Sequence, residues 1–163
     1  MNKRHICCIL GQRTIEKTKE LSIQLYDIIE KLILNENVDT FLFGSKSGFN
    51  DFCLDLVTKI KEKYPHIKRV YVRAEYQYIS EHYINYLLES YEDTYYPQSI
   101  IGSGKAVYIK RNYEMINNSQ FCIVYYDEQN VPTNRKSGTK IALDYAIKKG
   151  KHVINLPISM DEF

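Results

Sequence analysis

Short apolar runs alternate with amphipathic stretches along almost the whole chain, and this alternation limits the folds open to it. The run from His5 to Leu10 is nearly all apolar, as expected for a strand that is buried on both faces. The stretch from Thr14 to Leu34 repeats apolar residues at intervals of three and four, which predicts a helix. Further strands are expected at 39–43, 68–72, 121–126 and 152–156, and further helices at 49–63, 108–118 and 139–149.

Strands that are separated by helices form parallel βαβ units with right-handed crossovers. We therefore predict an α/β fold in which residues 1–163 form one Rossmann-like three-layer α/β/α domain, with a mostly parallel sheet of about five strands. The pattern weakens between residues 75 and 104. There, 79–90 indicates a helix and 91–104 a long loop, and long loops in compact domains are often functional.

Composition narrows the range of partners. The net charge is only +2 and the basic residues are scattered along the chain, which argues against a nucleic-acid partner. No apolar run approaches the length of a membrane span, so we expect no membrane partner. The first ten residues lack the small-residue cleavage site of a signal peptide, and a cytoplasmic location follows as the default expectation.

The cysteines and histidines do not have the spacing of a metal or redox site. No CxxC pair is present, and neighbouring Cys7 and Cys8 point to opposite faces of one strand. We predict reduced thiols buried in the core, with no metal and no other cofactor. The 15 tyrosines allow two interpretations, side-chain packing or a stacking surface for bases, and we favour packing.

In an open α/β sheet, ligands bind outside the carboxyl ends of the strands. The first strand is followed by Gly11 and Arg13. Gly11 would let the backbone approach a ligand, and Arg13 would open the next helix, where its guanidinium can bind a phosphate. The competing interpretation is a tight turn followed by a surface arginine.

Two further loops place polar groups at helix starts. Gly44, Ser45 and Gly48 follow the second strand, and their backbone N–H groups and the helix dipole would form an anion cradle. The last helix begins at Ser137-Gly138-Thr139, where capping and phosphate binding use the same groups. Arg111 lies in the helix expected at 108–118. It is either part of an exposed basic turn or a positive charge directed at the ligand.

Several of these motifs in order resemble the SLOG superfamily, which includes the DNA-processing protein DprA and the cytokinin-activating "lonely guy" phosphoribohydrolases. They are the run from Tyr108 to Met115, Asn118-Ser119, the strand 121–126, the Ser137–Thr139 turn, Ala142 with Ala146, and Gly150. The early Gly11-Gln12-Arg13 and Gly44 with Gly48-Phe49 are most similar to the YpsA-like branch. The resemblance covers nearly the whole chain except about residues 75–100, and implies a Rossmannoid domain that binds nucleotides or their derivatives.

The same resemblance implies roles for single residues. Arg111 matches the catalytic arginine of the phosphoribohydrolases, and Ser137-Gly138-Thr139 matches their phosphate-binding turn. The hydrolases carry a glutamate three residues after that threonine, whereas this chain has Ala142. If the chain is an enzyme, Asp127 or Glu128 would have to supply the missing carboxylate.

Three functions follow from these observations. The first is binding or sensing of a nucleotide-derived or other phosphorylated small molecule. The second is an N-glycosidase or phosphoribohydrolase-like enzyme that uses Arg111 with Asp127 or Glu128. The third and least favoured is binding of single-stranded DNA, which the near-neutral charge argues against. The sequence leaves the oligomeric state open, a homo-oligomer included.

Overall fold

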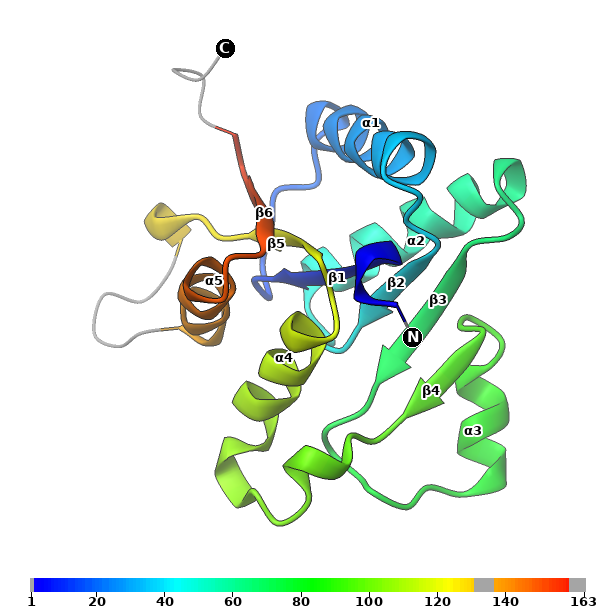
Figure 1. The fold of residues 1–163 in the computed structure, drawn as a ribbon, viewed down its shortest axis with the longest axis vertical. Coiled ribbons are helices and arrows are strands. Elements are labelled where there is room, and N and C mark those ends of the chain that lie inside the picture. The colour runs from blue at the N-terminus through cyan, green and yellow to red at the C-terminus, as the bar shows by residue number, and fades with distance from the viewer. Residues whose placement is uncertain (1, 131–136, 159–163) are drawn as a thin grey trace.

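The computed structural model describes residues 2–130 and 137–158, and its centre is a six-stranded parallel sheet in the order β4-β3-β2-β1-β5-β6 (Figure 1). The strands are β1 (Ile6–Gly11), β2 (Thr40–Phe43), β3 (Lys68–Val72), β4 (Asp93–Tyr95), β5 (Phe121–Tyr125) and β6 (His152–Leu156). The helices are α1 (Lys19–Asn35), α2 (Gly48–Lys63), α3 (Glu81–Leu87), α4 (Val107–Asn117) and α5 (Gly138–Lys148). The predicted Rossmann-like α/β architecture is confirmed, with one strand more than expected.

Helices cover both faces of the sheet, which explains why its central strands are apolar throughout. Cys7 and Ile9 of β1 pack with α1, α2 and α3 on one face. Cys8 and Leu10 of the same strand pack with α4 and α5 on the other. Figure 1 shows α4 and α5 together on one side of the sheet and α1 on the opposite side. All four cysteines are buried and unpaired, as predicted.

The first helix begins later than the periodicity predicts. Thr18 has extended backbone angles, and its hydroxyl accepts a hydrogen bond from the Leu21 N–H at 3.1 Å, so it caps a helix that starts at Lys19. The prediction that Arg13 opens this helix is therefore wrong. Arg13 lies in the exposed connection between β1 and α1.

The segment 91–104 is not one long loop, because it contains β4. This three-residue strand pairs with β3, with Val70 opposite Asp93. A strand so short shows no alternation in sequence, and its polar residues suit a sheet edge. The helix expected at 79–90 is shorter in the structure and spans Glu81–Leu87, with Ser80 as its cap.

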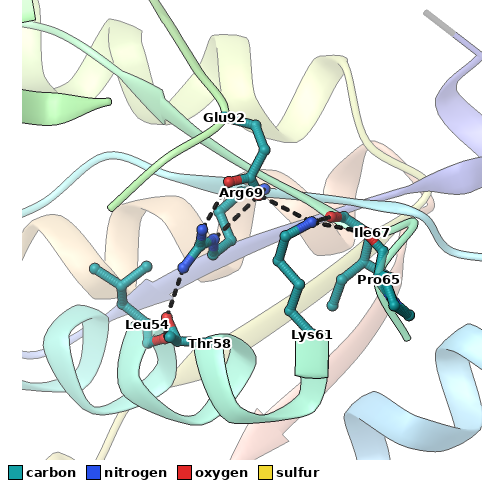
Figure 2. A network of polar contacts seen from close by, with 7 residues as sticks. All are labelled: Leu54, Thr58, Lys61, Pro65, Ile67, Arg69 and Glu92. Atoms are coloured by element: carbon teal, nitrogen blue, oxygen red, sulfur yellow. Dashed lines mark hydrogen bonds and ion pairs between the residues drawn. The ribbon is translucent and has the colours of Figure 1, made fainter. Parts of the chain in front are cut away.

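A polar network fixes the amino end of β3, far along the strand from the edge where ligands are expected (Figure 2). Arg69 binds the Glu92 carboxylate through two nitrogens, at 3.1 and 2.6 Å, and donates a third hydrogen bond to Thr58. Lys61 of α2 donates to the main-chain oxygens of Pro65 and Ile67. The network ties α2 to β3 and to the start of β4. Among the described helices, none is long and apolar enough to cross a membrane.

Candidate functional site

The sheet order places a switch point between β1 and β5, where the chain leaves two neighbouring strands toward opposite sides. Gln12 bridges this point: its Nε2 donates a hydrogen bond to the main-chain oxygen of Asp127 at 3.0 Å. The side chain is buried, and its Oε1 has no hydrogen-bond partner among the described residues. The switch point therefore presents a buried acceptor that the described part of the chain does not satisfy.

The three glycines of the first two loops are required by close packing. A Cβ on Gly11 would lie 2.4 Å from Cδ2 of Phe49. A Cβ on Gly48 would lie 2.5 Å from the carbonyl oxygen of Arg13, and one on Gly44 would lie 2.6 Å from Sδ of Met115. These glycines thus allow close contact with neighbouring protein atoms. This packing brings together the loops that follow β1 and β2.

The start of α2 has its first N–H groups already bonded. Gly48 donates to the Arg13 oxygen at 2.8 Å and Phe49 to the Gln12 oxygen at 3.4 Å. Asn50 donates to Oγ of Ser47, which also accepts a hydrogen bond from the Ser45 hydroxyl at 2.9 Å. Gly48 and Phe49 hold the loop that follows β1, and Asn50 binds the Ser47 cap, so the helix start that the sequence suggests as an anion cradle is occupied by the protein itself.

The start of α5 is arranged differently. Ser137 caps the helix, because its Oγ accepts from the Lys140 N–H at 3.1 Å. The N–H groups of Gly138 and Thr139 have no acceptor among residues 2–130 and 137–158. A Cβ on Gly138 would meet no atom of the described residues within 4 Å. Two helix-terminal donors without an acceptor among those residues therefore lie at the positive end of the α5 dipole.

Arg111 of α4 is buried, with 5% of its surface exposed, so the interpretation as an exposed basic turn is wrong. Its Nη1 donates to the carbonyl oxygen of Gly44, and its Nε donates to Oδ1 of Asn112 at 3.1 Å. The guanidinium lies over the ring of Tyr108, 5.8 Å from the ring centroid. It makes no ion pair with any described carboxylate. Burial lowers the pKa of Arg111, while Tyr71 and Glu75 act in the opposite direction.

The carboxylates that would serve an enzyme follow β5. Asp127 lies beside the switch point, where its Oδ1 accepts a hydrogen bond from the Gln129 N–H at 3.1 Å. Glu128 is exposed and begins a short 3₁₀ helix. Ala142, at the position of the hydrolases' glutamate, is buried against the sheet with Ala146. The structure thus brings Arg111 to the tip of β2 and Asp127 to that of β5.

One group of polar residues near this edge is not among the site residues predicted from the sequence. Lys46 follows β2 and forms an ion pair with Glu75, which follows β3, at 3.3 Å. Arg73 lies between β3 and Glu75. The sequence does contain a signal for Arg73, because this residue directly follows the strand predicted at 68–72. Within the described residues, no group of three His, Cys, Asp or Glu side chains is arranged to hold a metal ion.

Comparison with known families supports the resemblance seen in the sequence. The family model YpsA, described as the YspA SLOG family, matches residues 12–162. This span runs from the switch point through α5 and β6, so it includes every loop of the candidate site except Gly11. A search of curated proteins gives no match. The chain belongs to the YspA SLOG family.

Proposed function

We propose that this protein binds a nucleotide-derived or other phosphorylated small molecule at the carboxyl edge of its sheet. Membership of the SLOG family is consistent with a nucleotide-related role. The proposed site extends from the tip of β2 across the β1–β5 switch point to the start of α5. Its charged and hydrogen-bonding groups come from Arg111, Gly138 and Thr139.

The observation that carries the proposal is the burial of Arg111 without a carboxylate partner among the described residues. Removing a guanidinium from water is costly unless an anion or several hydrogen bonds replace the lost hydration. Arg111 has a carbonyl and an amide oxygen as acceptors, and both are uncharged. A phosphate would supply the missing negative charge, and a guanidinium matches its geometry.

The start of α5 supplies a second element of the proposal. Unbonded N–H groups at a helix start bind anions, because the donors and the helix dipole act together. Gly138 and Thr139 offer two such donors, and the Ser137 hydroxyl leaves them available because it caps the Lys140 N–H. By contrast, the donors at the start of α2 are already used.

The remaining predicted residues take supporting roles in this proposal. Gly11, Gly44 and Gly48 allow the loops to pack closely, as the contacts at their Cβ positions indicate. Arg13 and Ser45 lie at the rim. Arg13 is exposed, while the Ser45 hydroxyl is directed to Ser47.

Binding is favoured over phosphoribohydrolase activity because Ala142 supplies no carboxylate at the position where the hydrolases have one. The alternative enzyme would depend on Asp127 or Glu128 for acid–base chemistry. Release of free base from a nucleoside monophosphate, lost in Asp127→Asn, would favour that alternative.

A thermal-shift screen tests the proposal, using nucleotides, cyclic nucleotides, NAD derivatives and sugar phosphates. A ligand at a hundred times its Kd adds about 2.7 kcal/mol of stability, or roughly 5–10 °C for a chain of this size. Arg111→Gln should lose the shift, whereas Lys110→Gln should keep it, because Lys110 is the exposed neighbour on the same helix. The absence of any shift across the panel, or shifts that are all unchanged in Arg111→Gln, would contradict the proposal.

A further inference from the structure

A pocket lies beside the carboxyl edge, between the end of β3 and α3. The connection from β3 to α3, which borders the pocket, runs along the lower part of Figure 1. We call it the β3–α3 pocket; its volume is about 410 Å³. It is lined by Lys46, Glu75, Tyr76, Tyr78, Ile79 and Tyr83, together with Ser80. None of these residues belongs to the site proposed above, so the inference does not depend on that function.

Arg73 lines a second, smaller hollow next to this pocket. The hollow has a volume of about 10 Å³ and shares Glu75, Tyr76, Ile79 and Tyr83 with the main pocket. Nε and Nη1 of Arg73 are buried and have no hydrogen-bond partner among the described residues. The guanidinium also makes no ion pair with them. Glu75, the nearest carboxylate in sequence, is paired with Lys46.

Arg69 of β3 shows how an arginine with a structural role is bonded in this protein. Three of its nitrogens donate hydrogen bonds to side chains, two of them to the Glu92 carboxylate (Figure 2). Arg73 has no comparable partner among residues 2–130 and 137–158. Buried donors without acceptors are costly, and such groups in a pocket indicate a ligand that supplies the acceptor. Since the donors belong to a cation, the favoured acceptor is an anion.

The walls indicate what carries that anion. Tyr76 and Tyr78 are 62% and 86% exposed, so their rings are large apolar surfaces that the fold leaves uncovered. Tyr83 lines both the pocket and the smaller hollow beside it. Aromatic side chains bind flat rings by stacking. We propose that the β3–α3 pocket binds a planar aromatic ring carrying a phosphate or carboxylate, with the ring against the tyrosines and the acidic group on Arg73.

Isothermal titration calorimetry of the whole chain tests this with two ring anions and their neutral counterparts. Adenosine 5′-monophosphate is compared with adenosine, and nicotinate with nicotinamide, so that a phosphate and a carboxylate source are distinguished. Inorganic phosphate controls for an anion without a ring. At least one ring anion should bind, and its neutral counterpart should bind about tenfold or more weakly, because a hydrogen-bonded charge is lost.

Two sets of variants assign the binding to this pocket. Arg73→Gln should weaken it at least about tenfold. Tyr76→Ala should weaken it several-fold through loss of a stacking partner, while Tyr76→Phe keeps the ring and the affinity. Because Tyr76 is exposed, these variants remain informative if Arg73→Gln fails to fold. Binding that persists in Arg111→Gln is separate from the proposed function, and a loss in both arginine variants would indicate one ligand that reaches both.

Two results would overturn the inference. One is that neither ring anion binds the wild-type chain at millimolar concentration. The other is that every binding event disappears in Arg111→Gln and is unchanged in both Arg73→Gln and Tyr76→Ala, which would assign all binding to the carboxyl edge.

Discussion

Replacing Gly138 by aspartate separates helix stability from phosphate binding at the start of α5. A Cβ at this position meets no atom of the described residues within 4 Å, so the new side chain causes no steric strain with them. A carboxylate in the first turn interacts favourably with the helix dipole, by about 0.3–1 kcal/mol. The melting temperature of the unliganded variant should therefore rise by about 1–4 °C.

The same carboxylate should oppose a bound phosphate. If the phosphate accepts hydrogen bonds from Gly138 and Thr139, the two negative groups lie roughly 5 Å apart. At an effective dielectric constant of about 20, their repulsion is about 3 kcal/mol per charge pair, or more than a hundredfold in Kd. Gly138→Asn is the matched control, because it has the same shape without the charge.

Calorimetric titration with a nucleoside monophosphate measures both variants. Gly138→Asn should bind with close to the wild-type affinity, while Gly138→Asp should be more stable and bind far more weakly. Equal affinity of the two variants would refute the placement of an anion at the start of α5.

Three further predictions concern stability and reactivity. Gly48→Ala should destabilise the fold by about 1–3 kcal/mol in urea unfolding, because its Cβ would lie 2.5 Å from the Arg13 oxygen; an unchanged midpoint would contradict the packing argument. Glu92→Gln should cost about 2–3 kcal/mol, because Arg69 is left largely buried without its carboxylate. Burial raises the pKa of Glu92, but the hydrogen bonds and charge of Arg69 outweigh it, so the net shift is downward. This contribution is present above the unfolded pKa of about 4.3 and is lost as pH falls through the lower folded pKa, so acid titration should affect Glu92→Gln less than wild type. Thiol reagents at pH 8 should label the native chain only slowly, because the cysteines are buried and burial raises the pKa of the Cys7, Cys8 and Cys53 thiols. Rapid labelling of these three residues in the native chain would contradict this prediction.

Sequence patterns predict the central architecture because every buried strand is apolar on both faces. β3 and β6 have the predicted bounds, and Gly150 has the positive φ expected of a glycine after α5. The pattern cannot reveal β4, since three residues at a sheet edge carry no periodicity. The late start of α1 depends on a single side-chain cap, Thr18, while the apolar spacing already begins at Ile15.

The candidate site can be predicted only in part from the sequence. Position after a strand correctly suggests that the loops at Gly11, Gly44 and Ser137 share one edge of the sheet. It does not reveal that the helix donors at Gly48 and Phe49 bind the loop after β1, while those at Gly138 and Thr139 have no acceptor in the described part of the chain. That difference depends on contacts between segments more than 30 residues apart. The burial of Arg111 and of the Arg73 nitrogens likewise depends on tertiary packing.

Binding of a phosphate at the carboxyl edge can be followed through backbone amide signals in a ¹⁵N–¹H correlation spectrum during titration with a nucleoside monophosphate. We expect large saturable shifts for the amides of Gly138 and Thr139 and for the Nε–H of Arg111. The amides of Gly48 and Phe49 should move little, because they already donate to main-chain oxygens. Shifts that leave Gly138, Thr139 and Arg111 unmoved would contradict a phosphate site at this edge of the sheet.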